Sequence, residues 1–182
     1  MKLIKKIKSP DFDRTEENVR IREAVRAILL DEGGRVGMIF AKNGGFYKLP
    51  GGGIDVNESK EVALAREIIE ETGYESEIIR DVGYTIEEYP RMKKRNCCMI
   101  GKSYVYVARA TKFVGRNLME DEMADGFEFG WVESVPRAIK LIDDAQIMET
   151  EFTEEAAIRM IEEREKAILE FYEKEENENH KI

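Results

Sequence analysis

The sequence predicts an α/β fold: an α/β/α sandwich in which helices cover both faces of a mixed sheet, with an additional C-terminal helix. Runs rich in Val, Ile, Leu and Phe alternate with segments of helical periodicity, and Gly, Asn and Pro separate them. The 182 residues contain no internal repeat and no linker that would split them. We therefore expect one domain over residues 1–182, with a polar lead at 1–20, a core at 21–142, a C-terminal helix at 153–175 and a frayed tail at 177–182.

The first half of the chain is predicted to consist mainly of strands. A short strand is expected at Leu3–Lys8. The runs Ala24–Leu30 and Val36–Ala41 are apolar and rich in branched side chains, and the turn residues Asp31–Gly34 between them predict a hairpin. Phe46–Leu49 is expected to form a further strand, after which a proline and three glycines lead the chain into a loop.

A helix is expected from Ser59 to Thr72, because apolar residues recur there at helical spacing between a polar cap and Gly73. Asn57 or Ser59 supplies the cap. In such a helix, Glu67, Glu70 and Glu71 would point largely away from the side that carries the apolar stripe. The predicted buried stripe consists of Val62, Ala65, Ile68 and Ile69.

The second half is predicted to contain three strands and two helices. The strands are expected at Ile78–Glu88, Met99–Thr111 and Phe127–Val132, and the helices at Ser134–Ile142 and Thr153–Glu175. A basic segment at residues 89–96 is expected to be an exposed hairpin or, alternatively, a phosphate clamp, and an acidic segment at 120–126 to be a loop. Apolar residues mark the buried side of the last helix: Ala156, Met160, Ile161, Ile168, Phe171 and Tyr172.

Glu67, Glu70 and Glu71 form the most informative cluster of the chain. Their spacing of i, i+3 and i+4 places the carboxylates on one face of the predicted helix, near its C-terminal end, where the helix dipole is already negative. Like-charge pairs at this spacing cost roughly 0.2 to 0.5 kcal/mol each, and only the adjacent Arg66 is expected to offset them. The cluster therefore indicates a functional site whose missing partner is a divalent cation.

Residues 52–74 resemble the signature of the Nudix hydrolase family, GX5EX7REUXEEXGU, in which U is aliphatic. The only departure is Tyr74 at the last aliphatic position. The resemblance implies a Nudix-like sandwich and metal-dependent hydrolysis of a nucleoside diphosphate linked to a group X, giving a nucleoside monophosphate and phosphorylated X. The matching residues are Gly52, Glu58, Arg66, Glu67, Ile68, Glu70, Glu71 and Gly73.

The resemblance also implies roles for the matched residues. Glu70 and Glu71 would bind the metal, and Glu67 would bind metal or act as the base. Arg66 would orient the neighbouring carboxylates, and Glu58 would support the loop and the start of the helix.

The expected metal is Mg2+, with Mn2+ as the alternative, because the candidate ligands are carboxylates and the main-chain carbonyl of Gly51. Zinc is disfavoured, since the single histidine, His180, lies in the tail and the two cysteines are neighbours. The expected nucleophile is a metal-bound water deprotonated with the help of a glutamate. Outside the signature we expect Glu122 to be that base, with Glu120 and Asp125 as alternatives.

The composition limits the partners. A formal net charge of −9 argues against a nucleic-acid polymer and leaves a small-molecule nucleotide diphosphate derivative as the expected partner. The adjacent Cys97 and Cys98, and the absence of a signal-like or membrane-spanning stretch, predict a cytoplasmic protein that does not bind membranes. The C-terminal helix is expected to pack on the core or to form a homodimer surface.

The identity of the substrate is left open. Pro90, 16 residues after Tyr74, resembles a feature of ADP-ribose hydrolases, whereas Tyr89 favours dinucleoside polyphosphates and the short domain also suits oxidised nucleoside triphosphates. The alternative to an enzyme is a catalytically idle Nudix-fold module that binds a nucleotide, although such a module would be expected to have lost acids that this chain retains. Some aromatic residues belong either to the core or to a base-stacking surface: Phe46, Tyr47, Tyr84, Tyr89 and Phe127.

Overall fold

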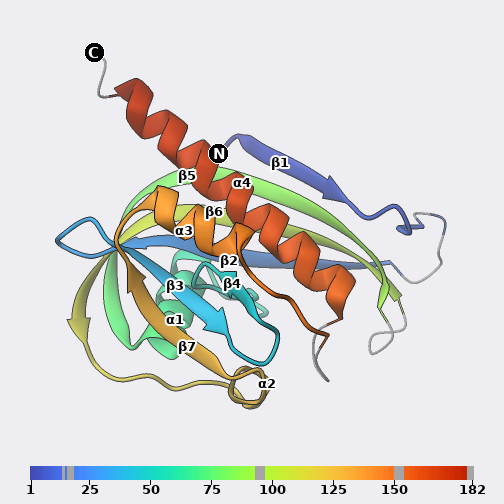
Figure 1. The fold of residues 1–182 in the computed structure, drawn as a ribbon, viewed down its shortest axis with the longest axis horizontal. Helices are drawn as coiled ribbons and strands as arrows, with labels where there is room; N and C mark the ends of the chain where they lie inside the picture. The colour runs from blue at the N-terminus through green and yellow to red at the C-terminus, as the bar shows by residue number, and fades with distance from the viewer. Residues whose placement is uncertain (14, 16–18, 93–96, 150–153, 180–182) are drawn as a thin grey trace.

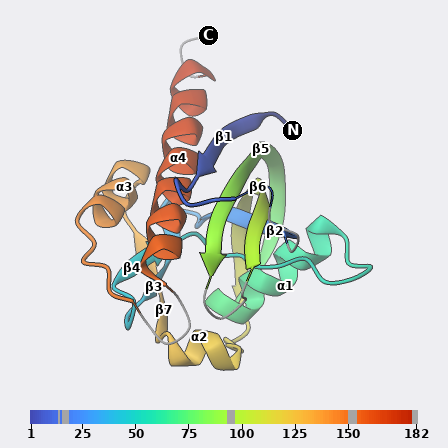
Figure 2. The same cartoon turned by 90° about the vertical axis from the view of Figure 1, so that its right-hand side faces the viewer.

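The protein folds into three layers, with one sheet between two sets of helices (Figures 1 and 2). The computed structural model describes residues 1–13, 15, 19–92, 97–149 and 154–179. Helix α1 (Lys60–Thr72) covers one face of the sheet, and α3 (Val135–Asp143) and α4 (Glu155–Asn179) cover the other. The predicted α/β/α sandwich with a C-terminal helix is therefore confirmed.

The sheet is mixed, as predicted. Within the described residues its strand order is β1-β5-β6-β2-β3-β4. Strand β7 lies off this path and pairs with β3. The pairs β1–β5 and β2–β6 are parallel, while β5–β6 and all pairs that involve β3 are antiparallel. The strands are β1 (Leu3–Lys8), β2 (Arg20–Leu30), β3 (Val36–Ala41), β4 (Phe46–Lys48), β5 (Tyr74–Met92), β6 (Cys97–Phe113) and β7 (Phe127–Val132).

Strand β2 contributes to the core on both faces of the sheet. Val25, Ala27 and Leu29 pack in the cluster that includes α1, whereas Ile28 packs in the cluster that includes α3 and α4. This division follows from the two-residue period of a strand. Arg26 shares the parity of Ile28 and therefore faces the α4 side, although it is a buried cation within an apolar run.

Helix α1 begins and ends as predicted, but a different face of it is buried. The Ser59 hydroxyl accepts from the Val62 N–H, and Gly73 closes the helix in the left-handed conformation with φ of 79°. Of the predicted stripe, Ile68 is buried as expected, Ala65 and Ile69 are only partly buried, and Val62 is 59% exposed, which contradicts the prediction for that residue. The buried face includes Ala63, Leu64, Glu67, Ile68, Glu71 and Thr72. Two of the carboxylates thus point inward, because polar partners inside the protein compensate their burial.

Three further expectations are corrected. The acidic segment contains a short helix, α2 (Glu120–Ala124), whose Glu122 side chain accepts from the Met119 N–H at 2.8 Å. The C-terminal helix continues through residues 177–179, which were expected to be frayed, and Ala157 rather than Ala156 is buried. The predicted start of that helix at Thr153, the tip of the basic segment at 93–96, and His180 lie outside the described residues.

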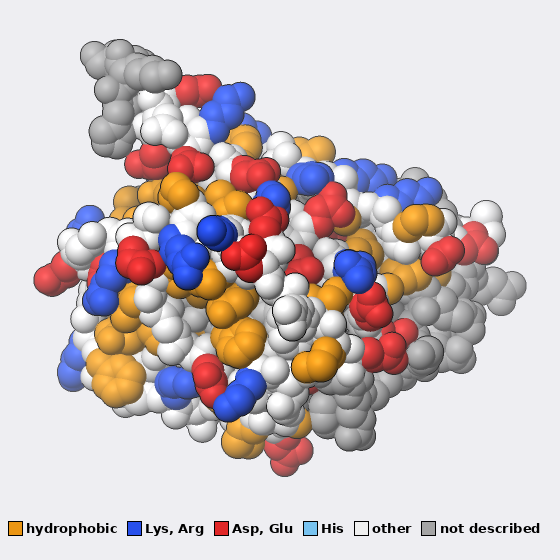
Figure 3. Space-filling view, in the orientation of Figure 1, with side chains coloured by type: hydrophobic (Ala, Val, Ile, Leu, Met, Phe, Trp, Pro, Cys, Tyr) orange, Lys and Arg blue, Asp and Glu red, His pale blue; other side chains and the backbone are white. Residues whose placement is uncertain are grey.

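The outer surface of the α3 and α4 layer is strongly charged. Figure 3 shows acidic and basic side chains interspersed over this side. Lys166 pairs with Asp143 at 2.6 Å, and Arg159 pairs with Glu155 at 2.7 Å. Such exposed pairs contribute little stability, which fits a solvated face. Among the helices described, none combines the length and apolar character needed to cross a membrane.

Candidate metal and catalytic site

Arg66 organises the acidic residues just before α1 and in its C-terminal half. Its guanidinium donates to both carboxylate oxygens of Glu58 at 2.9 Å, to Glu67 at 2.9 Å and to Glu70 at 3.0 Å. It also donates to the carbonyl of Gly53 at 3.0 Å. Because a guanidinium presents its donors in a rigid planar fork, these contacts fix the helix and the glycine loop relative to each other.

The glycine loop lies so close to α1 and β2 that side chains are excluded from it. A Cβ on Gly52 would lie 2.4 Å from both carboxylate oxygens of Glu67, and a Cβ on Gly51 would lie 2.2 Å from the carbonyl oxygen of Val25. Gly51 also has φ of 134°, which disfavours any other residue. The loop thereby brings backbone groups directly against the carboxylates of the helix.

Glu71 is fully buried, with hydrogen bonds to both of its oxygens. The Gly51 N–H donates to Oε2 at 2.8 Å, and the Lys48 ammonium donates to Oε1 at 2.6 Å and to the Gly51 carbonyl at 3.3 Å. Arg66 was the only offsetting cation predicted from the sequence, and Lys48 was not predicted. A lysine one residue before the Leu-Pro-Gly-Gly run was the available signal.

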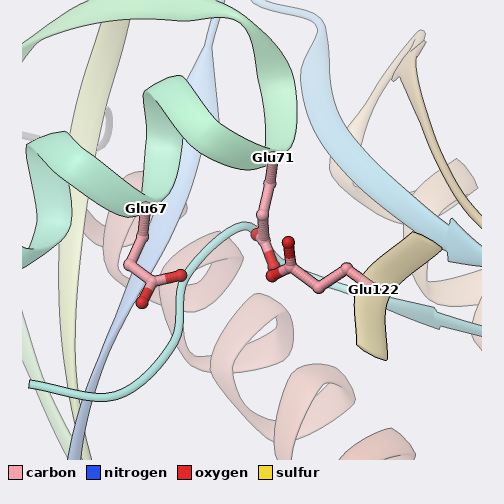
Figure 4. A group of neighbouring side chains, drawn as sticks. All are labelled: Glu67, Glu71 and Glu122. Carbon is pink, nitrogen blue, oxygen red and sulfur yellow. The ribbon is translucent and has the colours of Figure 1, made fainter. Parts of the chain in front are cut away.

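Glu122 reaches this site from α2. Carboxylate oxygens of Glu67, Glu71 and Glu122 lie within 4.8 Å of one another, and Figure 4 shows the Glu71 and Glu122 side chains approaching end to end. Glu70 lines the same cavity but is held by Arg66 outside this trio. Of the alternative bases, Asp125 is buried and lines the cavity, while Glu120 is exposed.

Burial and mutual repulsion govern the protonation of the carboxylates. Desolvation, followed by the charge of Glu71, raises the pKa of Glu67. Desolvation also raises the pKa of Glu71, and Lys48 opposes that shift. In contrast, the hydrogen bonds from Arg66 lower the pKa of Glu58 to about 2. A cation among Glu67, Glu71 and Glu122 would relieve their repulsion, and carboxylate and carbonyl oxygens are the ligands that Mg2+ and Mn2+ prefer.

The site opens into a cavity of about 490 Å³ that is lined by side chains of both charges. The carboxylates of α1 and α2 line it, and so do Arg22, Arg26 and Arg164. These three arginines were not predicted from the sequence. Arg26 was detectable as a charge inside the apolar run Ala24–Leu30, but nothing local identifies Arg164. Of the five aromatic residues considered, three line the cavity: Phe46, Tyr89 and Phe127.

A family model of the NUDIX domain matches residues 20–150. The chain belongs to the NUDIX domain family, as its resemblance to the Nudix hydrolases predicted. The match covers the glycine loop, α1 and α2, whereas α4 lies beyond it.

One curated relative and two solved structures add to this comparison. A Bacillus subtilis (strain 168) protein named "Putative 8-oxo-dGTP diphosphatase" is 39% identical over 56 residues, which span 31% of this chain and only 38% of that protein. A crystal structure of UDP-X diphosphatase has a TM-score of 0.52 at 15% identity, covering 90% of this chain and 68% of the other. A NUDIX hydrolase from Nitrosomonas europaea has a TM-score of 0.50 at 16% identity, covering 80% and 88%. Both structures share the fold.

Proposed function

We propose that the protein is a Nudix pyrophosphohydrolase that uses Mg2+ or Mn2+ to hydrolyse a nucleoside diphosphate linked to a group X. The products are a nucleoside monophosphate and phosphorylated X. The observation that carries the proposal is the convergence of Glu67, Glu71 and Glu122 within 4.8 Å, at the edge of a cavity large enough for a nucleotide. The family match supports the reaction class.

Glu67, Glu71 and the carbonyl of Gly51 would hold the metal, and Glu70, which lines the same cavity, would be a further ligand. When bound, the ion supplies Lewis acidity and lowers the pKa of a coordinated water. Arg66 keeps Glu67 in place through its hydrogen bond. Glu122 lies opposite Glu71 and accepts the proton of the attacking water at its carboxylate (Figure 4).

The arginines that line the cavity, Arg22, Arg26 and Arg164, would bind the anionic part of the substrate. Their charge explains how a protein of net charge −9 admits a polyanion. ADP-ribose, dinucleoside polyphosphates and oxidised nucleoside triphosphates remain the substrate candidates, the last favoured by the name of the Bacillus subtilis relative.

Cys97 and Cys98 are buried thiols, in keeping with a cytoplasmic location. A homodimer through α4 remains a further proposal.

The test is hydrolysis of a nucleotide panel with Mg2+, Mn2+ or EDTA, with the products separated. The expected result is metal-dependent release of a nucleoside monophosphate, with turnover lowered by orders of magnitude in Glu71→Gln but not in Glu77→Gln, whose side chain is exposed on β5. If the protein binds a nucleotide but hydrolyses it with neither Mg2+ nor Mn2+, the result would instead support the alternative of a catalytically idle nucleotide-binding module. Full activity of Glu71→Gln would contradict the metal assignment.

A further inference from the structure

Two buried arginines from opposite ends of the chain meet on the wall of the cavity. Arg26 in β2 is 7% exposed and Arg164 in α4 is 3% exposed, yet both line the cavity. Met99, Ala157 and Ile161 add apolar side chains to the lining of the same cavity. Desolvated guanidinium groups are costly to bury, so their presence at a cavity wall calls for a partner.

The anionic partners inside the protein account for only part of their hydrogen-bonding capacity. Glu165 is fully buried, contacts NH2 of Arg164 at 2.5 Å and lies 3.9 Å from Nε of Arg26. Glu87, another buried carboxylate whose charge acts on Arg164, accepts from the hydroxyls of Thr85 and Ser103. In the described part of the chain, Nε of both arginines and Oε2 of Glu165 have no hydrogen-bond partner. Each guanidinium carries five N–H donors, and those with a partner here are one amino group of Arg164, on Glu165, and Nη1 of Arg26, which donates to the Val25 carbonyl at 3.0 Å. The remaining amino groups are the donors proposed for a ligand.

Arg26 links this pair to the metal and catalytic site. A Cβ on Gly51 would lie 3.0 Å from the Cα of Arg26, so the strand runs directly against the loop whose N–H binds Glu71. Arg22, on the same face of β2, has its NH2 atom 3.2 Å from the position of a Cβ on Gly53. The cations thus extend along β2 from the glycine loop toward α4.

We propose that Arg26 and Arg164 bind a phosphoryl group of the substrate beyond the diphosphate held next to Glu67, Glu71 and Glu122, that is, a third phosphate. The inference rests on the proposed function and deepens it, because it makes nucleoside triphosphates and longer polyphosphates the preferred class. Nucleoside diphosphates linked to an uncharged sugar have no group for this subsite. Arginine suits it, since a guanidinium binds phosphate oxygens through two parallel hydrogen bonds, and the apolar neighbours strengthen these by excluding water.

Helix α4 contributes Arg164 to this subsite from outside the family match. Residues 155–179 lie outside the NUDIX match at 20–150, and α4 packs against β1, β4 and β5. Arg164 is therefore a specificity-determining residue supplied by a segment that takes no part in the signature.

Steady-state kinetics of Arg164→Met with a nucleoside triphosphate and a nucleoside diphosphate sugar test the proposal. The wild type is expected to favour the triphosphate, and the variant to raise KM for the triphosphate about tenfold or more while changing KM for the sugar nucleotide less than about twofold. Arg159→Met, on the exposed side of the same helix, is the matched control and should change neither. Equal increases for both substrates, or a wild-type preference for the sugar nucleotide, would overturn it.

Removal of Arg164 leaves buried Glu165 with only the more distant Arg26, so the double variant Arg164→Met/Glu165→Gln is measured as well. Calorimetric titration with inorganic tripolyphosphate and pyrophosphate gives a readout that needs no turnover. The wild type should bind tripolyphosphate more tightly, and both Arg164 variants should lose that difference. If no nucleotide is hydrolysed, the proposed function fails, and the titration alone decides the subsite: an unchanged preference for tripolyphosphate in the variants refutes it.

Discussion

The ammonium of Lys48 lies 2.6 Å from Glu71 and 3.3 Å from the carbonyl of Gly51, two of the groups assigned to the metal. Lys48 therefore neutralises Glu71 and, at the same time, repels a divalent cation placed beside it. Lys48→Met should leave a buried carboxylate uncompensated and lower the melting temperature without metal, since breaking a buried pair costs about 3–5 kcal/mol. Addition of Mg2+ should then raise the melting temperature more in the variant than in the wild type. An equal or smaller increment would show that Lys48 does not compete with the ion.

Glu122→Gln should reduce the catalytic rate about tenfold or more, because the amide cannot accept the proton of the attacking water. The melting temperature should change little, because Glu122 is partly exposed. Its hydrogen bond from the Met119 N–H caps only a short helix, and the glutamine side-chain oxygen can still accept it. Glu120→Gln, two residues earlier on α2 and exposed, provides the control. Wild-type rates in Glu122→Gln at saturating substrate and Mg2+ would transfer the role to Asp125 or Glu67.

Gly52→Ala should displace Glu67 without unfolding the protein. The new methyl group would lie 2.4 Å from both oxygens of that carboxylate, and the flexible end of a glutamate side chain can move aside. Activity should fall about 10²-fold, since misplacement of a catalytic group by about 1 Å has that effect. Gly130→Ala is the matched control, because a Cβ there meets no atom within 4 Å. Kinetics and thermal unfolding of both variants check the expectation, and normal activity in Gly52→Ala would contradict the proposed position of Glu67.

Glu162→Gln should stabilise the protein near neutral pH. Burial raises the pKa of Glu162 from 4.5 to about 6, and its Oε1 has no hydrogen-bond partner among the described residues. Between these two pH values the folded protein retains a proton that the unfolded chain releases, so stability falls as the pH rises through this range. The variant's free energy of unfolding at pH 7 should exceed that of the wild type by about 1 kcal/mol at most, because solvent screens a partly exposed group.

Urea unfolding at about pH 7 and about pH 4 measures this gain, which should vanish at the lower pH, where both states are protonated. Glu170→Gln, an exposed site on the same helix, serves as the control. A stabilisation of the same size at both pH values would show that titration is not its cause.

Local sequence patterns were sufficient for most elements of this fold. The bounds of β3 and β7 agree with the predicted strands, and Ser59 and Gly73 delimit α1 as expected, because strand alternation and helix caps depend on neighbouring residues. The buried face of α1 was not predictable in this way. Glu71 tolerates burial only because Lys48, 23 residues earlier, is brought beside it by β4.

The candidate site likewise contains residues that local sequence patterns identify and residues that only the tertiary structure brings together. The signature locates Glu67, Glu70 and Arg66 by identity, since they are fixed to one helix. Glu122 was chosen only as one acid among several, and its approach to Glu67 depends on how α2 packs near β7. Arg26 and Arg164 lie 138 positions apart in sequence, a relationship that only the tertiary structure reveals.

The placement of α4 also bears on the order in which the molecule is completed during synthesis. The ribosome produces the glycine loop and α1 well before residues 155–179, and α4 finally docks beside β1, where Lys2 pairs with Glu175 at 2.6 Å. Until that docking, the acidic groups of α1 are accompanied by Arg22 and Arg26 of β2 but not by Arg164. The emerging polypeptide would therefore complete the proposed metal site before the proposed phosphoryl subsite.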